Sequence, residues 1–157
     1  MFKTHLFLVA TVVAVKAETH TIHFVNRCGF GTPTLIVGGR VASTGDDFTC
    51  STGGILGGIA YLQTGACGFN GEGCTMVETT LINPVNGPGS GSSTDITLIP
   101  PHSFSVTTGF GYYNGCNGAG ADCTNANCGT AKHKSSDSFV QVACQDNNVN
   151  LVVTFCD

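Results

Sequence analysis

The sequence predicts an all-β protein, a disulfide-stapled antiparallel β-sandwich of two sheets, and three observations lead to this class. Short runs of β-branched and aromatic residues alternate with clusters of Gly, Asn and Pro, a pattern typical of sandwiches. Glycine supplies 22 of the 157 residues, about twice its usual ~7% share, which favours turns over long helices. Nine cysteines in a chain of this length indicate a disulfide framework if the protein is exported.

Eight segments have the composition of strands, and turn residues separate them. A Gly/Thr/Pro turn follows the first segment, and the long turn Asn83–Gly91 lies between the fourth and the fifth. The Gly/Asn-rich stretch Asn114–Asn127 is interpreted as a loop that cysteines staple, because three cysteines lie in it or just beyond it. In chain order, the predicted strands are Thr21–Val25, Thr34–Val37, Ile59–Gln63, Met76–Ile82, Thr94–Ile99, Ser103–Phe110, Ser138–Ala143 and Val149–Phe155.

Residues 1–17 have the pattern of a signal peptide. Lys3 and His5 precede the apolar run Leu6–Val15, and Val15-Lys16-Ala17 ends in the small or apolar residues that signal peptidase accepts. The alternative is a buried first strand. A run of about ten apolar residues is far shorter than the ~20 that a transmembrane helix needs. We therefore expect cleavage after Ala17, a mature domain of residues 18–157, and an extracellular location in the cell wall or apoplast.

The charge balance and the missing motifs exclude several classes of function. Six Lys and Arg residues against ten Asp and Glu residues argue against a nucleic-acid partner. The sequence has no Gly-x-Ser-x-Gly nucleophile motif and no glycine-rich phosphate loop with a lysine. It also lacks the Cys-x-x-Cys pairs of a zinc site, so we expect no metal, and it shows no cofactor motif, so we expect no cofactor. Because the apolar run near the start is short, we expect no membrane span.

Two carboxylates on predicted strands, Glu78 and Asp95, are the candidate catalytic residues. Two carboxyls that face one cleft can share the acid and base roles of glycoside hydrolysis, although solvated strand acids are the plainer interpretation. Tyr61 and Tyr112 are candidates for stacking on sugar rings, and their alternative is a place in the core or at its rim. Spacing alone does not decide between these readings.

The nine cysteines leave one thiol over, because nine is an odd number. Eight paired cysteines allow 105 connectivities, and their spacing does not select one of them. The unpaired thiol is either reactive or, more commonly, buried and inert.

The two ends of the predicted mature chain resemble those of thaumatin-like proteins, the thaumatin and osmotin family. Val25-Asn26-Arg27-Cys28 and Val153-Thr154-Phe155-Cys156 carry the most specific part of this resemblance. Further segments similar to that family's strands and turns are Gly38-Gly39-Arg40, Gly58–Gly65, Met76–Leu81 and Thr94-Asp95-Ile96. The long form of the family has sixteen cysteines and a second, loop-rich domain. With nine cysteines, this chain resembles the small form, which is reduced to the sandwich of thaumatin-like domain I.

The resemblance also implies a disulfide pairing. It suggests the bonds Cys28–Cys156, Cys67–Cys74, Cys116–Cys144 and Cys123–Cys128, with Cys50 as the free thiol. The protein is then expected to be a monomer, unless Cys50 forms an intermolecular bond that links two copies.

In the thaumatin family an Arg, a Glu and three Asp line an acidic cleft. Glu78 and Asp95 match the Glu and one Asp, Gln63 stands at the Arg position, and the other two Asp are missing. The predicted ligand-binding set is therefore Gln63, Glu78, Asp95, Tyr61 and Tyr112. The half-present cleft favours binding over hydrolysis.

Three functions follow from the resemblance. The first is a secreted protein that binds β-1,3-glucan or a related cell-wall polysaccharide, with a defence, antifungal or wall-remodelling role. The second is a weak endo-β-1,3-glucanase that uses Glu78 and Asp95. The third is a secreted effector, inhibitor or immunomodulatory protein that acts on a secreted or surface protein.

Overall fold

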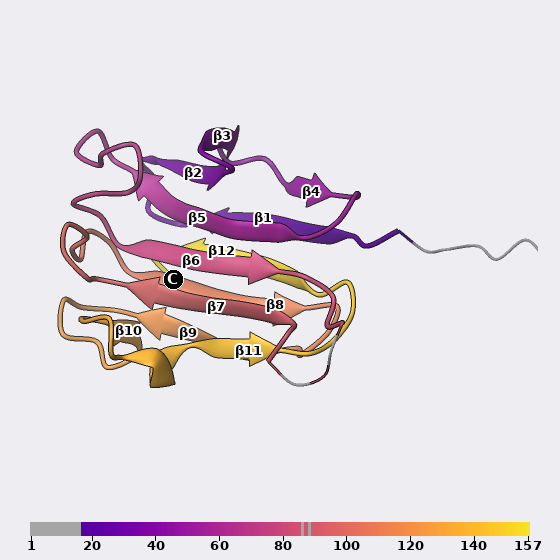
Figure 1. The fold of residues 1–157 in the computed structure, drawn as a ribbon. Coiled ribbons are helices and arrows are strands. Elements are labelled where there is room, and N and C mark those ends of the chain that lie inside the picture. Colours follow the sequence, from indigo (N-terminus) through magenta and orange to yellow (C-terminus); the bar gives the residue numbers. More distant parts are fainter. Residues whose placement is uncertain (1–16, 86, 88) are drawn as a thin grey trace, which may run out of the picture.

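The computed structural model describes residues 17–85, 87 and 89–157, so the predicted signal peptide lies outside it except for Ala17. Two β-sheets pack against each other as the layers of a sandwich (Figure 1). Within the described residues the helical structure is a single 3₁₀ turn, η1 (Ser138–Val140). The predicted all-β, disulfide-stapled sandwich is confirmed.

The chain passes repeatedly between the two sheets, because the strands of the smaller sheet come from the start, the middle and the end of the described chain. The five-stranded sheet has the order β4 (Phe48–Cys50), β1 (His20–Asn26), β12 (Asn150–Phe155), β8 (Thr108–Tyr113) and β9 (Gly120–Cys123). The seven-stranded sheet has the order β10 (Ala131–Lys132), β7 (Ser92–Thr97), β6 (Met76–Leu81), β5 (Ile55–Gln63), β2 (Thr32–Val37) and β3 (Arg40–Ser43), and β11 (Val142–Cys144) also pairs with β7.

Each of the eight predicted strand segments overlaps an observed strand, but two of them begin too early. Residues 103–107 are not a strand, because Ser103 and Ser105 hydrogen-bond to the segment around Thr75 instead of to a ladder. Residues 138–140 form η1, and β11 starts only at Val142. Four short strands of two to four residues had no separate prediction from periodicity, namely β3, β4, β9 and β10.

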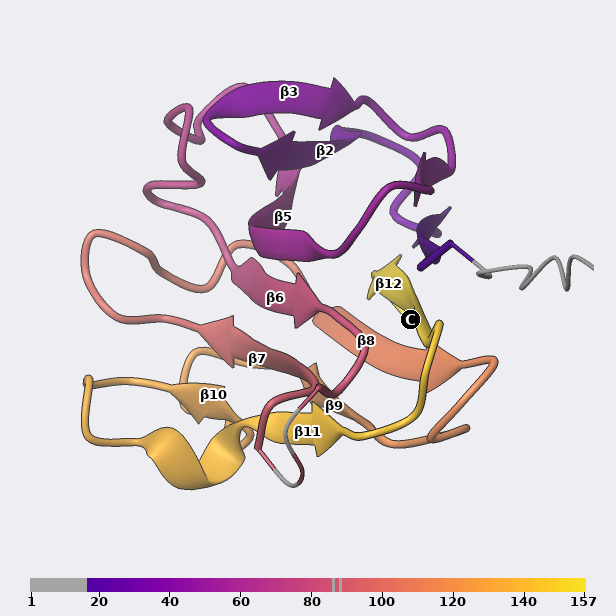
Figure 2. The same cartoon turned by 45° about the vertical axis from the view of Figure 1, so that its right-hand side comes forward.

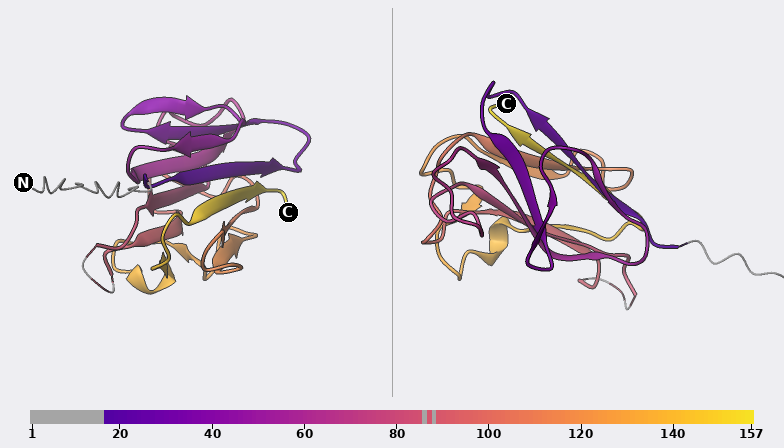
Figure 3. Two further views of the ribbon diagram at one scale, coloured as in Figure 1. Left: turned by 90° about the vertical axis from the view of Figure 1, so that its right-hand side faces the viewer. Right: turned by 90° about the horizontal axis from the view of Figure 1, so that it is seen from above.

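The sheets are not wholly antiparallel, which corrects one part of the predicted class. β1 pairs with β12 in parallel, and so does β10 with β7. The first and last strands lie side by side in the middle of the five-stranded sheet (Figure 3). Parallel neighbours cannot be joined by a short hairpin. Long segments of chain therefore connect β1 to β12 and β7 to β10.

The core lies between the sheets and is built from alternate positions of the strands. In β1 and β12 buried and partly exposed residues alternate, as expected of strands with one face on a core. The fully buried core side chains include Ile22, Leu35, Val77, Ile96, Leu151 and Phe155.

Four disulfides have the pairing that the resemblance implied, namely Cys28–Cys156, Cys67–Cys74, Cys116–Cys144 and Cys123–Cys128. Cys50 is free and partly buried, and it is the last residue of the edge strand β4. Cys28–Cys156 joins the segments that follow β1 and β12, so it closes the parallel pair covalently.

A hydrogen-bond network holds the start of the described chain. His20 has no exposed surface, and its ring nitrogens lie 2.6 Å from Val149 O and 2.9 Å from Glu18 Oε1. The Val149 carbonyl and the Glu18 carboxylate are both acceptors. The two ring nitrogens can therefore both form hydrogen bonds only if both carry a proton or if Glu18 carries one. Asn83 N–H also donates to Glu18 Oε1, at 2.5 Å, which ties the chain start to the segment after β6.

Replacing both Cys28 and Cys156 by Ser is expected to lower the free energy of unfolding by about 5 kcal/mol, because that bond closes a loop with a sequence separation of 128. The same change at Cys123 and Cys128, whose separation is 5, should cost about 2 kcal/mol in the same chain-entropy model. Urea unfolding of the two double variants checks this order. An equal loss in both variants would contradict it.

The charge of Glu18 should make stability depend on pH. Burial opposes ionisation, but hydrogen bonds from Asn83 N–H and His20 outweigh it and lower the pKa of Glu18 below its ordinary 4.5. A carboxyl whose pKa is lower in the folded state stabilises the fold at pH values above its ordinary pKa. This stabilisation is lost as the pH falls through the folded-state pKa. Glu18→Gln, which keeps the acceptor, should therefore be less stable than wild type at pH 7, and the difference should shrink as the pH falls below 4.5. Thermal unfolding between pH 7 and pH 2 measures the difference, and a gap that does not shrink over this range would exclude the charge as its cause.

Candidate functional site

Two neighbouring strands of the seven-stranded sheet bring the predicted carboxyl pair together. The antiparallel register of β6 and β7 places Glu78 directly opposite Asp95, so both side chains project from one face. Val77 and Ile96, the adjacent pair in this register, are fully buried in the core. Because successive residues alternate between faces, the two carboxyls lie on the outer face of the sheet.

Asp95 is nevertheless only 2% exposed, and β10 and β11 pair with β7 along the edge next to it. Figure 2 shows these two short strands along one edge of β7, with the 3₁₀ turn between them. Lys132 Nζ in β10 donates to Asp95 Oδ1 at 2.7 Å. The backbone of Lys132 is fixed as well, since Leu98 N–H donates to its carbonyl at 2.8 Å.

The second oxygen of the same carboxylate has no such partner. Asp95 Oδ2 is buried and makes no hydrogen bond with any of the described residues. A buried acceptor without a donor is costly, so this atom marks a place where a donor is favoured.

Glu78 is half-buried and sits in an environment that disfavours its charge. Burial raises the pKa of Glu78 above its ordinary value, and the negative charge of Asp95 raises it further, while Lys132 acts in the opposite direction. Glu78 is therefore more readily protonated than a surface glutamate.

These side chains line a shallow pocket of about 190 Å³ on the outer face of the sheet. The lining combines carboxylates, an ammonium, hydroxyls and an amide, so it offers both donors and acceptors. The lining residues are Gly57, Glu78, Thr79, Thr80, Ser93, Asp95, Lys132 and Gln141. Sequence reasoning missed Lys132, Ser93 and Gln141, because no motif surrounds them.

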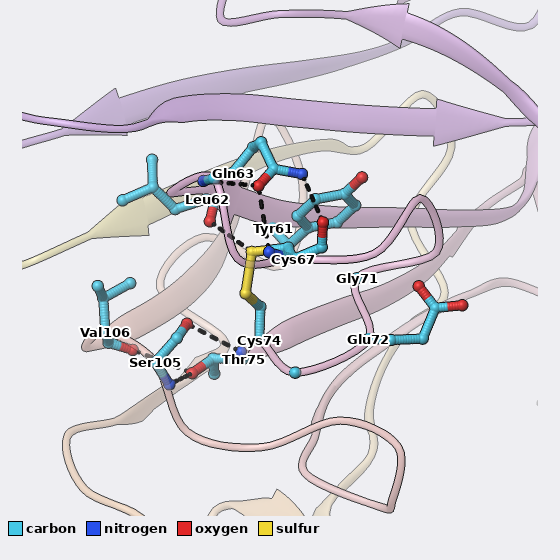
Figure 4. Close-up of a disulfide and its surroundings, with 12 residues drawn as sticks. Tyr61, Leu62, Gln63, Cys67, Gly71, Glu72, Cys74, Thr75, Ser105 and Val106 are labelled. Carbon is cyan, nitrogen blue, oxygen red and sulfur yellow. Dashed lines mark hydrogen bonds between the residues drawn. A yellow bond between two sulfur atoms is a disulfide. The ribbon is translucent and has the colours of Figure 1, made fainter.

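Gln63, a predicted ligand-binding residue, does not line this pocket. Its Nε2 donates to Cys67 O at 3.0 Å, and its Oε1 accepts from the backbone N–H groups of Gly65 and Cys67 (Figure 4). Gln63 thus organises the turn before the Cys67–Cys74 disulfide, and its polar groups are already used.

Tyr61 and Tyr112 do not present their rings at the surface, because each is only 2% exposed. The Tyr61 hydroxyl donates to Phe69 O at 2.8 Å, and the loop that the disulfide closes lies over its ring (Figure 4). The Tyr112 hydroxyl lies 2.9 Å from Thr94 Oγ1 and 3.0 Å from Val142 O, and burial raises its pKa to about 12. The structure places both rings in the interior, which corrects their prediction as a sugar-stacking surface.

One group of potential metal-binding atoms comes together within the described residues, at Cys116, Cys144 and Asp146. The two sulfurs form a disulfide, so neither is a thiolate that could bind a metal. Asp146 instead accepts the Cys116 N–H at 2.7 Å.

Comparison with known proteins identifies the fold. No protein-family model matches the sequence, and no curated protein matches it. Among solved structures, the chain is similar to the thaumatin-like xylanase inhibitor TLXI, with a TM-score of 0.51 over 88% of this chain and 99% of that chain. The chain has a thaumatin-like fold. The sequence identity is 19%, so the likeness concerns the fold alone.

The thaumatin-like fold confirms the resemblance seen in the motifs at the two chain ends. The four disulfides are typical of proteins that fold in an oxidising compartment, which is consistent with secretion. Among the described residues no helix is long and apolar enough to cross a membrane.

Lys132→Met should destabilise the protein by about 3 kcal/mol, because it leaves the charge of Asp95 buried without its partner. Lys134→Met is the matched control, since the Lys134 side chain is 74% exposed and its change should cost less than about 0.5 kcal/mol. Urea unfolding at pH 7 compares the two variants. Adding Asp95→Asn to Lys132→Met should recover most of the loss, and no recovery would show that the ion pair is not its cause.

Proposed function

We propose that this protein is a secreted, non-catalytic binding protein whose pocket at Glu78 takes the hydroxyl groups of a cell-wall polysaccharide such as β-1,3-glucan. The observation that carries the proposal is the pocket of about 190 Å³, in which Glu78, Lys132, Ser93 and Gln141 mix donors and acceptors. Sugar hydroxyls both donate and accept, so a neutral saccharide matches this lining. Removal of residues 1–17 and a role in defence or wall remodelling are parts of the same proposal.

The surroundings of Asp95 argue against a glucanase. A glycosidase needs two carboxyls that both reach the scissile bond, one as acid and one as base or nucleophile. Asp95 is 2% exposed and its Oδ1 is bound to Lys132, so this carboxylate is not free to act as a base or nucleophile at a scissile bond. Glu78 has the raised pKa that suits an acid, but no free second carboxylate stands beside it.

A second candidate function is the inhibition of a secreted hydrolase through protein contact. The similar solved structure is named a xylanase inhibitor. In this chain Phe139 is 79% exposed and lies beside a largely apolar hollow of about 280 Å³, lined also by Ala121, Val140 and Val142. An exposed aromatic beside an apolar hollow favours a protein partner over a sugar.

The wild-type protein should bind insoluble β-1,3-glucan, and the double variant Glu78→Gln, Asp95→Asn should bind it about fivefold more weakly, because a few sugar hydrogen bonds of about 1 kcal/mol in total are lost. A pull-down with quantified free protein measures this, and Asp46→Asn, an exposed carboxylate outside the pocket, is the control. Release of reducing ends by wild type but not by the double variant would overturn the non-catalytic assignment. No glucan binding together with inhibition of an endoxylanase would favour the second candidate.

A further inference from the structure

The buried oxygen of Asp95 needs a donor, and two kinds of donor can reach the pocket that it lines. Oδ1 is occupied by Lys132 at 2.7 Å, and Oδ2 has no partner among the described residues. Asp95 is 2% exposed, so bulk water does not solvate this atom freely. The candidates are the acid form of Glu78, which stands directly opposite on β6, and a hydroxyl of a ligand in the pocket.

We propose that Glu78 and Asp95 share one proton in the empty pocket, and that a bound saccharide hydroxyl replaces it, so that ligand binding releases a proton to solvent. This deepens the proposed function and rests on it. The two donors compete for Asp95 Oδ2, because a ligand hydroxyl that donates to this oxygen displaces the Glu78 proton from it. Glu78 then loses its proton to solvent, since its carboxylate accepts a charge-assisted hydrogen bond from a second ligand hydroxyl.

The charged groups around Glu78 are consistent with this exchange. Asp95 faces it from β7, Lys132 from β10, and His102 contributes a weaker positive influence from the segment between β7 and β8. On the other side β5 contains no charged residue. Burial and the Asp95 charge raise the pKa of Glu78, which is the direction that a shared proton requires.

The shared proton can be tested without any ligand. In a ¹³C NMR titration of the side-chain carboxyl carbons, Glu78 should titrate above its ordinary pKa, and the Asp95 signal should shift at the same midpoint. In Asp95→Asn, Glu78 should return toward its ordinary midpoint. Ordinary titration of Glu78 in wild type, or an Asp95 signal that does not respond to it, would overturn the inference.

The release on binding is measured by calorimetry with laminarin oligosaccharides in two buffers of different ionisation enthalpy. Below the Glu78 midpoint, wild type should release up to one proton, and its affinity should rise by up to about tenfold per pH unit before levelling above the midpoint. Glu78→Gln keeps a donor opposite Asp95 but has no proton to lose, so it should bind more weakly and release none.

Binding by wild type without proton release would overturn the exchange while leaving the proposed function intact. An absence of laminarin binding at every pH would overturn the proposed function together with the ligand-dependent half of this inference. The NMR titration would in that case still decide the shared proton by itself.

Discussion

The parallel pairing of the first strand with the last is the constraint on which the rest of the structure depends. β1 and β12 pair from Ile22 and Leu151 to Asn26 and Phe155, so the five-stranded sheet cannot form until the two chain ends meet. Closing a loop of nearly the whole chain costs conformational entropy. The Cys28–Cys156 disulfide offsets this cost by joining the same two segments. Only this sheet supplies the second apolar layer against which the seven-stranded sheet packs.

The candidate site also depends on a contact between two segments that are far apart in sequence. β10 has two residues, too few to be stable alone, and its pairing with β7 brings Lys132 to Asp95 across 37 positions of sequence. This short edge strand therefore supplies the countercharge of a buried carboxylate. Burying the carboxylate without that charge would cost several kcal/mol. The pocket is thus a consequence of how the chain after β9 pairs along the edge of β7.

Local patterns predicted the longer strands and the carboxyl pair, but not what covers them. Tyr61 stands in a run of three buried residues at the end of β5, because the Cys67–Cys74 loop lies over the ring on the face that would otherwise meet solvent. Nothing within the Tyr61 segment indicates that a loop of later residues will cover it. Gln63 is similar, since its amide is used by the turn at Cys67 and not by the pocket.

The sequence by itself determined the fold class, because strand period, turn residues and cysteine content are local or compositional properties. It also singled out Glu78 and Asp95 as a carboxyl pair on two predicted strands, through motifs that resemble a known family. The tertiary structure alone decided the parallel pairing, the burial of both tyrosines and the role of Lys132. Each of these is a contact between segments far apart in sequence, and the free energy of such a contact depends on burial and charge that only the folded chain creates.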